Sequence, residues 1–444
     1  MKYFIAFCFL LILSSCDNDD IIADTSILQL SDAITVYETS AVPNDLILVT
    51  PIRSDTTYLI NRQGMAVKKW YMDDSPVLMA YLLDNGSVVR AVITDVDNGI
   101  TIPGKTGKIQ IINKDNILVW EWVLDNASEA LHHDIAVLPN GNILASVWET
   151  HDASSSIAKG RNPQTLLENR LVVDKIIEIE PVGFNQANII WEWDLWDHLT
   201  QDFNPSASNF GNVANQPHLM DINVGAGENF SHVNGLDYIV ELDQIIVNSR
   251  ELSEFIIIDH STTTFQAANS SGGRYGKGGD FLFRWGNPRN FKTGTINDQQ
   301  LFGQHDATYV GNNSNSIGTF LVFNNLQDGV DFSTIKEIDV NIDATGSYPN
   351  IIGVGNAPSV AVWEYSNEAI LSKRTSGCQR LPSGNTLITS TSGLILREIN
   401  TSGKIIWEYN FENEAPSQLM MNTNSFKSRS YPRNNAGIQA LNLQ

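Results

Sequence analysis

The sequence predicts an all-β protein, and more narrowly a six-bladed β-propeller. An aromatic signature recurs at the end of a strand, as in Val119-Trp-Glu-Trp122, Ile190-Trp-Glu-Trp193 and Ile406-Trp-Glu-Tyr409. A hairpin turn that contains glycine recurs as well, as in Leu138-Pro-Asn-Gly141 and Leu381-Pro-Ser-Gly384. Two hairpins per unit make four strands, and six such units close into a ring that protects its strand edges. A pair of β-sandwiches, the alternative all-β architecture, does not predict a sixfold aromatic repeat.

The repeats divide the chain into a leader, a tether, a ring and a tail. We expect a signal peptide at residues 1–15, an acidic tether at 16–35, the propeller at 36–411, and a tail at 412–444 that is a candidate to close the ring. The six blades are predicted at residues 36–71, 72–123, 132–194, 232–287, 304–366 and 376–411. These limits leave open which terminus supplies the closing strand.

The N-terminus is typical of a secretory signal. Lys2 precedes an apolar run, Tyr3 to Leu13, that is too short to span a bilayer as a helix. The run ends in Leu13-Ser-Ser-Cys16, which resembles the bacterial lipobox, whose cysteine is lipidated and becomes the new N-terminus. An ordinary secretory signal is the alternative. The lipobox implies a protein held in the bacterial envelope by a lipid on Cys16, at the outer membrane and facing the periplasm or the cell surface.

Composition narrows the functional class. The net charge of −22 argues against nucleic acid as a partner, because phosphate binding needs clustered Lys and Arg. A hydrophobic fraction of 42% with 18% charged residues is typical of a globular domain. Cys378 is the one cysteine beyond the leader and the lipobox, so the folded body has no intramolecular disulfide and depends on packing.

Three histidines occupy the same strand position in three adjacent blades: His133, His232 and His305. Innermost strands line the axial channel of a propeller, so we expect these side chains to converge at one mouth. The histidine does not follow the repeat around the ring, because the equivalent positions in the other blades are Tyr37, Leu78 and Ser376. This confinement to one side of the channel indicates a functional role.

An arginine joins the three histidines. Arg250 ends the second strand of the blade that His232 begins, and antiparallel pairing brings those two ends together. Three imidazoles and a guanidinium predict a cationic pocket for an anion with several oxygens. A positioned histidine can also act as a nucleophile. Three histidines could instead hold zinc, but Arg250 would repel a dication, so no metal is expected.

Two pairs of motifs resemble the bacterial arylsulfotransferases (aryl-sulfate sulfotransferases). The first is Gln304-His-Asp-Ala307 before Phe320-Leu-Val-Phe-Asn-Asn325, and the second is His232-Val-Asn-Gly235 before Val247-Asn-Ser-Arg250. The resemblance covers residues 80–411. It implies a six-bladed propeller, which the repeats indicate independently.

The resemblance also implies roles for individual residues. His305 matches the nucleophile that accepts a sulfuryl group from an aryl sulfate ester and passes it to a phenolic acceptor, without a nucleotide sulfate donor or another cofactor. Three residues match those that hold the sulfuryl oxygens and assist proton transfer to the phenolate: His133, His232 and Arg250. Two more are candidate substrate contacts: His132 and Asn324.

Strand alternation bears on the neighbouring residues. His133 aligns with His305 through a shared His-Asp step, so alternation places His132 on the opposite side of the strand. Whether His132 or His133 belongs to the site stays open. The same alternation predicts that Asp134 and Asp306 bond to the backbone rather than to their neighbouring histidines. His260, in a turn on the other face, is predicted to be solvated.

The sequence therefore predicts a lipid-anchored propeller enzyme that moves a sulfuryl group between small aromatic molecules through a sulfohistidine. The alternative is a non-catalytic surface propeller that binds a sulfated or acidic ligand. Family members that dimerise do so through a separate N-terminal β-domain. Only about twenty residues, the predicted tether, lie between the predicted signal peptide and the first predicted blade, so a monomer is favoured.

Overall fold

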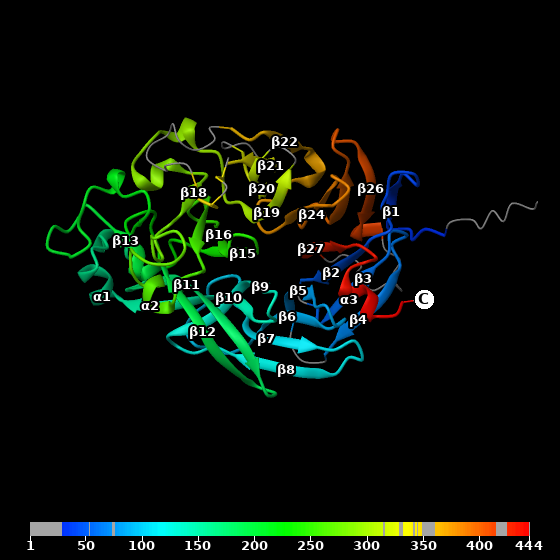
Figure 1. Ribbon diagram of the computed structural model, residues 1–444, viewed down its shortest axis with the longest axis horizontal. Helices are drawn as coiled ribbons and strands as arrows, with labels where there is room; N and C mark the ends of the chain where they lie inside the picture. Colours follow the sequence, from blue (N-terminus) through cyan, green and yellow to red (C-terminus); the bar gives the residue numbers. More distant parts are fainter. Residues whose placement is uncertain are drawn as a thin grey trace, which may run out of the picture.

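The strands of this computed structural model confirm the predicted six-bladed β-propeller (Figure 1). The structure describes residues 29–52, 54–72, 76–313, 316–327, 332–340, 342–343, 345–348, 360–413 and 424–443. Within these residues, six sheets of four or five antiparallel strands stand around a central axis. The innermost strands of the sheets, β27, β5, β9, β15, β19 and β23, line the axial channel.

In each blade the strands follow one another from the axis to the rim. Blade one contains β27 (Ser425–Tyr431), β2 (Leu46–Pro51), β3 (Thr56–Ile60) and β4 (Ala66–Tyr71). Blade two contains β5 (Val77–Leu82), β6 (Val88–Ile93), β7 (Gly107–Ile112) and β8 (Leu118–Val123). Blade three contains β9 (Glu129–Val137), β10 (Ile143–Asp152), β11 (Arg170–Val182) and β12 (Gln186–Asp194).

The other three blades have the same order. Blade four contains β15 (Val233–Ile239), β16 (Gln244–Ser249), β17 (Glu254–Asp259) and β18 (Phe283–Trp285). Blade five contains β19 (His305–Asn313), β20 (Ser316–Asn324), β21 (Thr334–Asp339) and β22 (Trp363–Ser366). Blade six contains β23 (Gly377–Arg380), β24 (Thr386–Ser390), β25 (Ile395–Ile399), β26 (Ile405–Asn410) and β1 (Ile34–Tyr37).

The remaining elements lie between the blades. Two short strands, β13 (Leu199–Thr200) and β14 (Met220–Asp221), pair in parallel within the insertion between blades three and four. The α-helices are α1 (Ala153–Ala158), α2 (Thr264–Ala267) and α3 (Ala436–Ala440). The 3-10 turns are Pro163–Thr165, Leu195–His198, Val213–Asn215, Pro288–Phe291, Ile296–Asp298, Glu368–Ile370 and Phe411–Asn413. No helix among the described residues is long and apolar enough to cross a membrane.

Both ends of the chain take part in closing the ring. Near the C-terminus, β27 pairs with β2, so it is the innermost strand of blade one. Near the N-terminus, β1 pairs with β26 and becomes a fifth, outermost strand of blade six. The prediction that Tyr37 stands at the channel is therefore wrong. Phe426 of β27 lies beside the channel histidines in its place.

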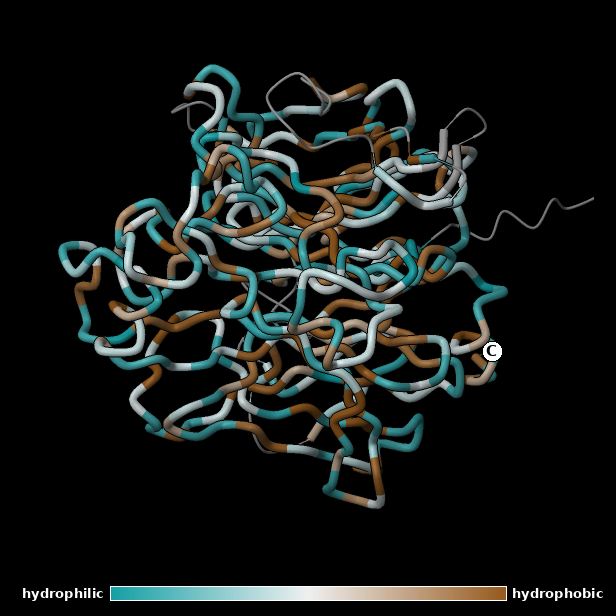
Figure 2. Tube along the Cα trace, turned by 60° about the vertical axis from the view of Figure 1, so that its left-hand side comes forward, coloured by the Kyte–Doolittle hydropathy of each residue, from teal (hydrophilic) through white to brown (hydrophobic). Residues whose placement is uncertain are grey.

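Apolar packing between neighbouring blades holds the ring together. Large aromatic side chains of the recurring signature, such as Trp70, Trp193 and Trp407, are buried in this packing. The larger core clusters join strands of adjacent blades; for example, Phe255 of blade four contacts Phe320 of blade five with ring centroids 5.4 Å apart. Hydrophobic stretches run through the body of the molecule, and hydrophilic stretches are frequent in the outer loops (Figure 2). The single cysteine among the described residues, Cys378, is buried and unpaired; the signal peptide and Cys16 lie outside these residues.

Candidate active site

Backbone bulges shape the inner strands where the histidines stand. His133 and His232 have φ angles of +44° and +46°, and Asp306, next to His305, has +57°. The pairing register shifts at the same places in β9, β15 and β19. Non-glycine residues rarely adopt such angles, and where they do the surrounding structure holds them there, often at functional sites. The bulges interrupt the simple alternation of side chains along each strand.

This interruption brings His132 and His133 together. Alternation predicted that His132 points away from His133, but their Nδ1 atoms lie 3.1 Å apart. Both side chains are almost fully buried. The His132 ring stacks on Trp148 with centroids 4.2 Å apart, and its Nε2 lies 3.1 Å from Asp174 Oδ1. Both histidines therefore belong to one cluster, in which His132 lies behind His133.

Asp174 on β11 orients the rear of the cluster. Its Oδ2 accepts hydrogen bonds from the Ser231 hydroxyl and from Val233 N, so the carboxylate is held between blades three and four. The Asp174 Oδ1 and His132 Nε2 atoms lie 3.1 Å apart but outside hydrogen-bond geometry, so this contact does not fix the tautomer of His132.

His232 and Phe426 complete the wall beside His133. The rings of His133 and His232 meet edge to face, with centroids 4.8 Å apart. Phe426 lies 6.2 Å from the His133 ring and 5.8 Å from the His305 ring, so it fills the space between blades three and five. His232 Nδ1 is held by the Asn229 side chain at 3.3 Å. The structure thus gathers His132, His133, His232 and His305 around one end of the channel, which we call the histidine mouth.

The tautomer of His305 is fixed by Asn325. His305 Nδ1 lies 2.7 Å from Asn325 Oδ1. The Asn325 amide nitrogen donates to the carbonyls of Ser372 and Thr375, at 2.7 and 2.8 Å, so its oxygen must face the imidazole. Nδ1 therefore carries the hydrogen and Nε2 carries the lone pair. Thr375 N–H donates to that lone pair at 3.1 Å.

Arg250 is the positive charge of the site. Its backbone N–H donates to His232 O at 3.0 Å, as the predicted antiparallel pairing requires. Its guanidinium forms a salt bridge with Glu251 and is partly exposed. Its charge helps to lower the pKa of all three predicted channel histidines.

Burial keeps the imidazoles neutral at physiological pH. Burial lowers the pKa of His305 to about 3, against the opposing effect of the Asn325 hydrogen bond. Burial also lowers the pKa of His232 to about 4, although Asp174 opposes the shift, and it lowers the pKa of His133 well below the usual range. The expectation of a pocket made cationic by three imidazoles is therefore corrected, because the permanent positive charge among the four predicted site residues is that of Arg250.

A layer of buried ion pairs lies one residue deeper in the channel. Asp134 and Asp306 do bond to backbone N–H groups, of Leu236 and Cys378, at 2.9 Å each. They also bind cations from β27: Lys427 Nζ lies 2.5 Å from Asp134 and 3.3 Å from Asp306, and Arg429 binds Asp306 through both terminal nitrogens. The Tyr81 hydroxyl donates to Asp134 at 2.9 Å. We call Asp134, Asp306, Lys427, Arg429 and Tyr81 the charge layer.

Two other predicted residues stand apart from the cluster. Asn324 is buried, but its side chain binds Phe302 N, Gln327 and Thr334 rather than a channel histidine. The prediction that His260 is solvated is wrong, because its ring nitrogens contact Asp243 at 2.7 Å and Glu178 at 3.0 Å. Burial would lower the pKa of His260, but these two carboxylates outweigh it and raise the value to about 9.

Sequence patterns do not reveal the residues that orient the imidazoles. Asn325 is one position beyond the end of β20, and its role follows only from its contact with His305. Asp174 and Thr375 reach the cluster from β11 and from the segment before β23, where no local pattern marks them. Among the described residues, no group of histidines, cysteines and carboxylates has the arrangement of a metal site.

Comparison with known proteins assigns the chain to a family. The model of the arylsulfotransferase (ASST) family matches residues 34–431, which is most of the chain. A search among curated proteins found no significant match. Among solved structures, the chain resembles a protein of unknown function from Bacteroides caccae, with a TM-score of 0.48, 11% identity, and 87% of this chain and 98% of that chain covered.

Virginiamycin B lyase from Staphylococcus aureus is a second structural relative, with a TM-score of 0.38, 13% identity, and 87% of this chain and 86% of that chain covered. Neither similarity is close enough to assign a function. The family match spans the whole propeller, including the histidine mouth and the strand that closes the ring. The chain therefore belongs to the arylsulfotransferase family and is an enzyme of sulfuryl transfer.

Proposed function

We propose that this arylsulfotransferase moves a sulfuryl group from an aryl sulfate ester to a phenol through a sulfohistidine on His305 Nε2. One observation carries the proposal: the Asn325 side chain fixes hydrogen on His305 Nδ1, so the lone pair of the imidazole is on Nε2, the atom that would attack. Because the pKa of His305 is about 3, that lone pair is unprotonated at neutral pH.

The first half-reaction forms an N–S bond and breaks an S–O bond. The Nε2 lone pair attacks sulfur, and the aryl oxygen leaves with the electrons of the S–O bond as a phenolate. The hydrogen on Nδ1 stays in place, so the imidazole becomes a cation balanced by the sulfonate that it carries. Asn325 Oδ1 stabilises this developing charge through the existing 2.7 Å hydrogen bond.

The sulfuryl oxygens need hydrogen-bond donors during this half-reaction. Arg250 supplies the fixed positive charge near the three imidazoles. Thr375 N–H, which now donates to Nε2, must release the lone pair before attack and is then free to donate to a sulfuryl oxygen. An anion bound at this mouth would also raise the pKa of His133 and His232, because it stabilises their protonated forms.

Proton transfer falls to the histidines across the mouth. A protonated His133 or His232 can give its proton to the departing phenolate, and the same group can take the proton from the incoming phenol in the second half-reaction. The charge of Asp174 favours the protonated form of His232, because it opposes the lowering of that pKa by burial. The phenolate of the acceptor then attacks sulfur, and the Nε2–S bond breaks to restore neutral His305.

Intact-mass spectrometry tests the covalent step. Wild-type protein mixed with 4-nitrophenyl sulfate and no acceptor, then quenched in base, is expected to gain the mass of one sulfuryl group. Peptide mapping should place this group on His305. Addition of phenol before the quench should remove the adduct. Release of nitrophenolate without any adduct under these conditions would contradict a sulfohistidine intermediate.

We expect Asn325→Ala to lower kcat about 10²-fold, because His305 loses the acceptor that fixes its tautomer. KM for the aryl sulfate should change little, since Asn325 contacts the imidazole and not the substrate. Asn324→Ala is the matched control, because Asn324 binds Phe302 N and Thr334 and has no contact with His305. Initial rates with 4-nitrophenyl sulfate and phenol would measure both variants, and equal kcat values for the two would exclude the positioning role.

The pH profile should show an acid limb far below the usual histidine range. His305, whose pKa is lowered to about 3, is neutral above that value and can act as the nucleophile. The single-turnover rate of nitrophenolate release should therefore hold from neutral pH to about 5 and fall only as the pH passes about 4. Unfolded histidines bind protons near pH ~6.5, so acid also reduces the free energy of unfolding, and circular dichroism must verify folding at each pH. A fall centred near pH ~6.5 in folded protein would contradict a neutral buried nucleophile.

A further inference from the structure

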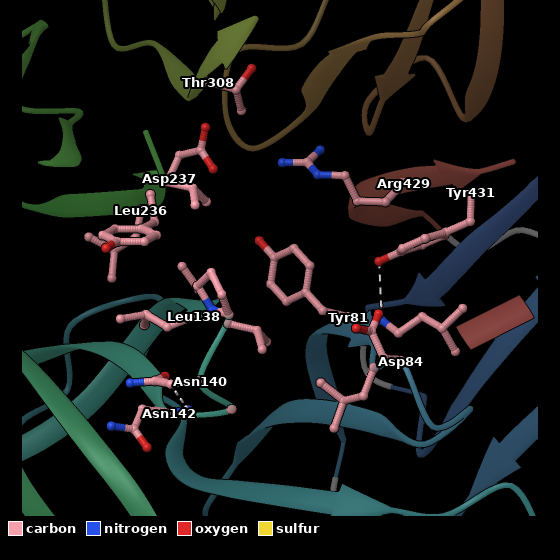
Figure 3. A pocket seen from close by; sticks show the side chains of 18 of the residues that line it. Tyr81, Asp84, Leu138, Asn140, Asn142, Leu236, Asp237, Thr308, Arg429 and Tyr431 are labelled. Atoms are coloured by element: carbon pink, nitrogen blue, oxygen red, sulfur yellow. Dashed lines mark hydrogen bonds between the residues drawn. The ribbon is translucent and has the colours of Figure 1, made fainter. Parts of the chain in front are cut away.

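The axial channel has a second open end. At the mouth opposite the histidines, a cavity of about 1030 Å³ is lined by inner strands of all six blades and by the hairpin turns near Asn85 and Asn140. None of the channel histidines lines it. We call this end the far mouth (Figure 3). Cavities of this size with a few convergent polar groups are the usual form of small-molecule sites.

The charge layer separates the far mouth from the histidine mouth. Along β27, Phe426 contacts the histidine rings, Lys427 lies buried between two aspartates, and Arg429 and Tyr431 line the far cavity. Along β19 the order is the same, from His305 through Asp306 to Thr308. The two mouths are therefore two sites on one axis, and a molecule in the far cavity does not reach His305 through the buried ion pairs.

Hydrogen-bond donors and hydrogen-bond acceptors both line the cavity of the far mouth. Figure 3 shows the polar ends of Asp237, Arg429 and Tyr81 around a common space, and Thr308 lines the same cavity above them. Asp237 is anchored by Tyr309 N–H, which donates to its Oδ2 at 2.8 Å. The Thr308 hydroxyl makes no hydrogen bond within the part of the chain that the structure describes. Acceptors, donors and a hydroxyl thus face one space.

The charges of the cavity argue against an anion. Both guanidinium groups of the lining are already paired, Arg429 with Asp306 and Arg380 with Glu337. Two further carboxylates, Asp84 and Glu180, line the exposed rim. An anionic ligand would therefore meet carboxylates at the rim and guanidinium groups that are already neutralised. Burial raises the pKa of Asp237 to about 6, so this group changes between acceptor and donor near physiological pH.

Aromatic surface is the other component of the lining. Tyrosines from four blades border the cavity: Tyr81, Tyr238, Tyr309 and Tyr431. Tyrosine presents a flat apolar face together with a polar tip, which suits a ligand that has apolar faces and a polar edge. Paired donors and acceptors such as Arg429 and Asp237 suit neighbouring hydroxyl groups, because each hydroxyl both accepts and donates.

We propose that the far mouth is a binding site for a neutral saccharide, held by Asp237, Thr308 and Arg429 and by the tyrosine faces. This site is independent of sulfuryl transfer, since the charge layer divides it from His305. The rim carboxylates exclude sulfated sugars, so the ligand differs from the sulfate donors of the histidine mouth.

Saturation-transfer NMR tests the proposal with full-length protein and four neutral trisaccharides: maltotriose, cellotriose, mannotriose and triacetylchitotriose. At least one should bind in the millimolar range or more tightly. Asp237→Asn and Thr308→Val keep the shape of each side chain, and each should weaken binding about tenfold, as the loss of one hydrogen bond does. Neither variant should change the rate of nitrophenolate release from 4-nitrophenyl sulfate.

His305→Ala provides the converse control, because it should lose sulfuryl transfer and retain trisaccharide binding. The trisaccharide-binding result can therefore be interpreted even if no sulfuryl transfer is observed, and the sulfuryl-transfer result can be interpreted even if no trisaccharide binds. The proposal is overturned if no trisaccharide binds to the wild-type protein, or if both cavity variants bind as the wild type does. Displacement of the bound trisaccharide by 4-nitrophenyl sulfate would overturn it as well, because the two mouths would then share one ligand.

Discussion

His305→Ala should lower kcat for transfer from 4-nitrophenyl sulfate to phenol by about 10³-fold or more, because the nucleophile of the proposed covalent step is lost. The fold should survive the change. The side-chain hydrogen bonds of His305 go to the Asn325 side chain and to the backbone of Thr375 and Gly303, and none of these residues belongs to the apolar clusters between blades. Stopped assays that follow nitrophenolate release and the sulfated phenol separately would measure the loss.

His218→Ala is the matched control for this variant. His218 is half-exposed on the insertion after blade three, and its nearest carboxylate oxygen, on Asp280, is 3.8 Å away. The control should keep full activity. A loss of activity in His305→Ala but not in His218→Ala would then be specific to His305 and not a general effect of replacing a histidine. If His305→Ala retains transfer and still forms a sulfuryl adduct, another channel histidine is the nucleophile, and His133 and His232 become the candidates.

Lys427→Met should lower the free energy of unfolding by about 3–5 kcal/mol, because it leaves two buried carboxylates with one cation between them. Lys427 is 3% exposed and lies 2.5 Å from Asp134 and 3.3 Å from Asp306. Burial would raise the pKa of Asp306, but Arg429 and Lys427 outweigh it and lower the value to about 2, so this carboxylate is charged at any pH of interest.

Lys404→Met is the control for the loss of a lysine. Its ammonium lies 2.9 Å from Glu38, but both side chains are exposed, and a surface pair of this kind contributes about 0–1 kcal/mol. Urea unfolding followed by tryptophan fluorescence compares the two variants, provided that both transitions are reversible. Similar midpoints for the two would show that the charge layer adds nothing beyond an ordinary surface pair.

The blades were predictable because their signal is local and repeated. Trp193 and Trp407 mark outer strands whose aromatic rings fill the space between neighbouring sheets, and that requirement recurs in each blade. The closing strand was not predictable in this way. Phe426-Lys-Ser-Arg-Ser-Tyr431 has no apolar alternation, because its inward side chains pack against carboxylates of a polar channel rather than against an apolar core.

The same distinction between what a local repeat reveals and what it does not applies to the site. His133, His232 and His305 could be found because equivalent positions of inner strands converge whatever the details of the backbone. Their orientation could not be found, because the positive φ angles at His133 and His232 break the period of two on which side-chain direction depends. The prediction that His260 is solvated failed for a related reason, since its partners are distant in sequence: Glu178 lies on β11 of blade three, and Asp243 lies in the turn before β16.

The position of β27 has a consequence for the order of events during biosynthesis. The strand pairs with β2 across nearly the whole length of the chain, and it carries both cations that neutralise Asp134 and Asp306. Blades two to five can be synthesised complete, yet their two central carboxylates lack these counter-ions until Ser425–Tyr431 has emerged. A chain interrupted after blade six would carry every channel histidine but would lack Phe426, which packs against them, and both cations of the charge layer.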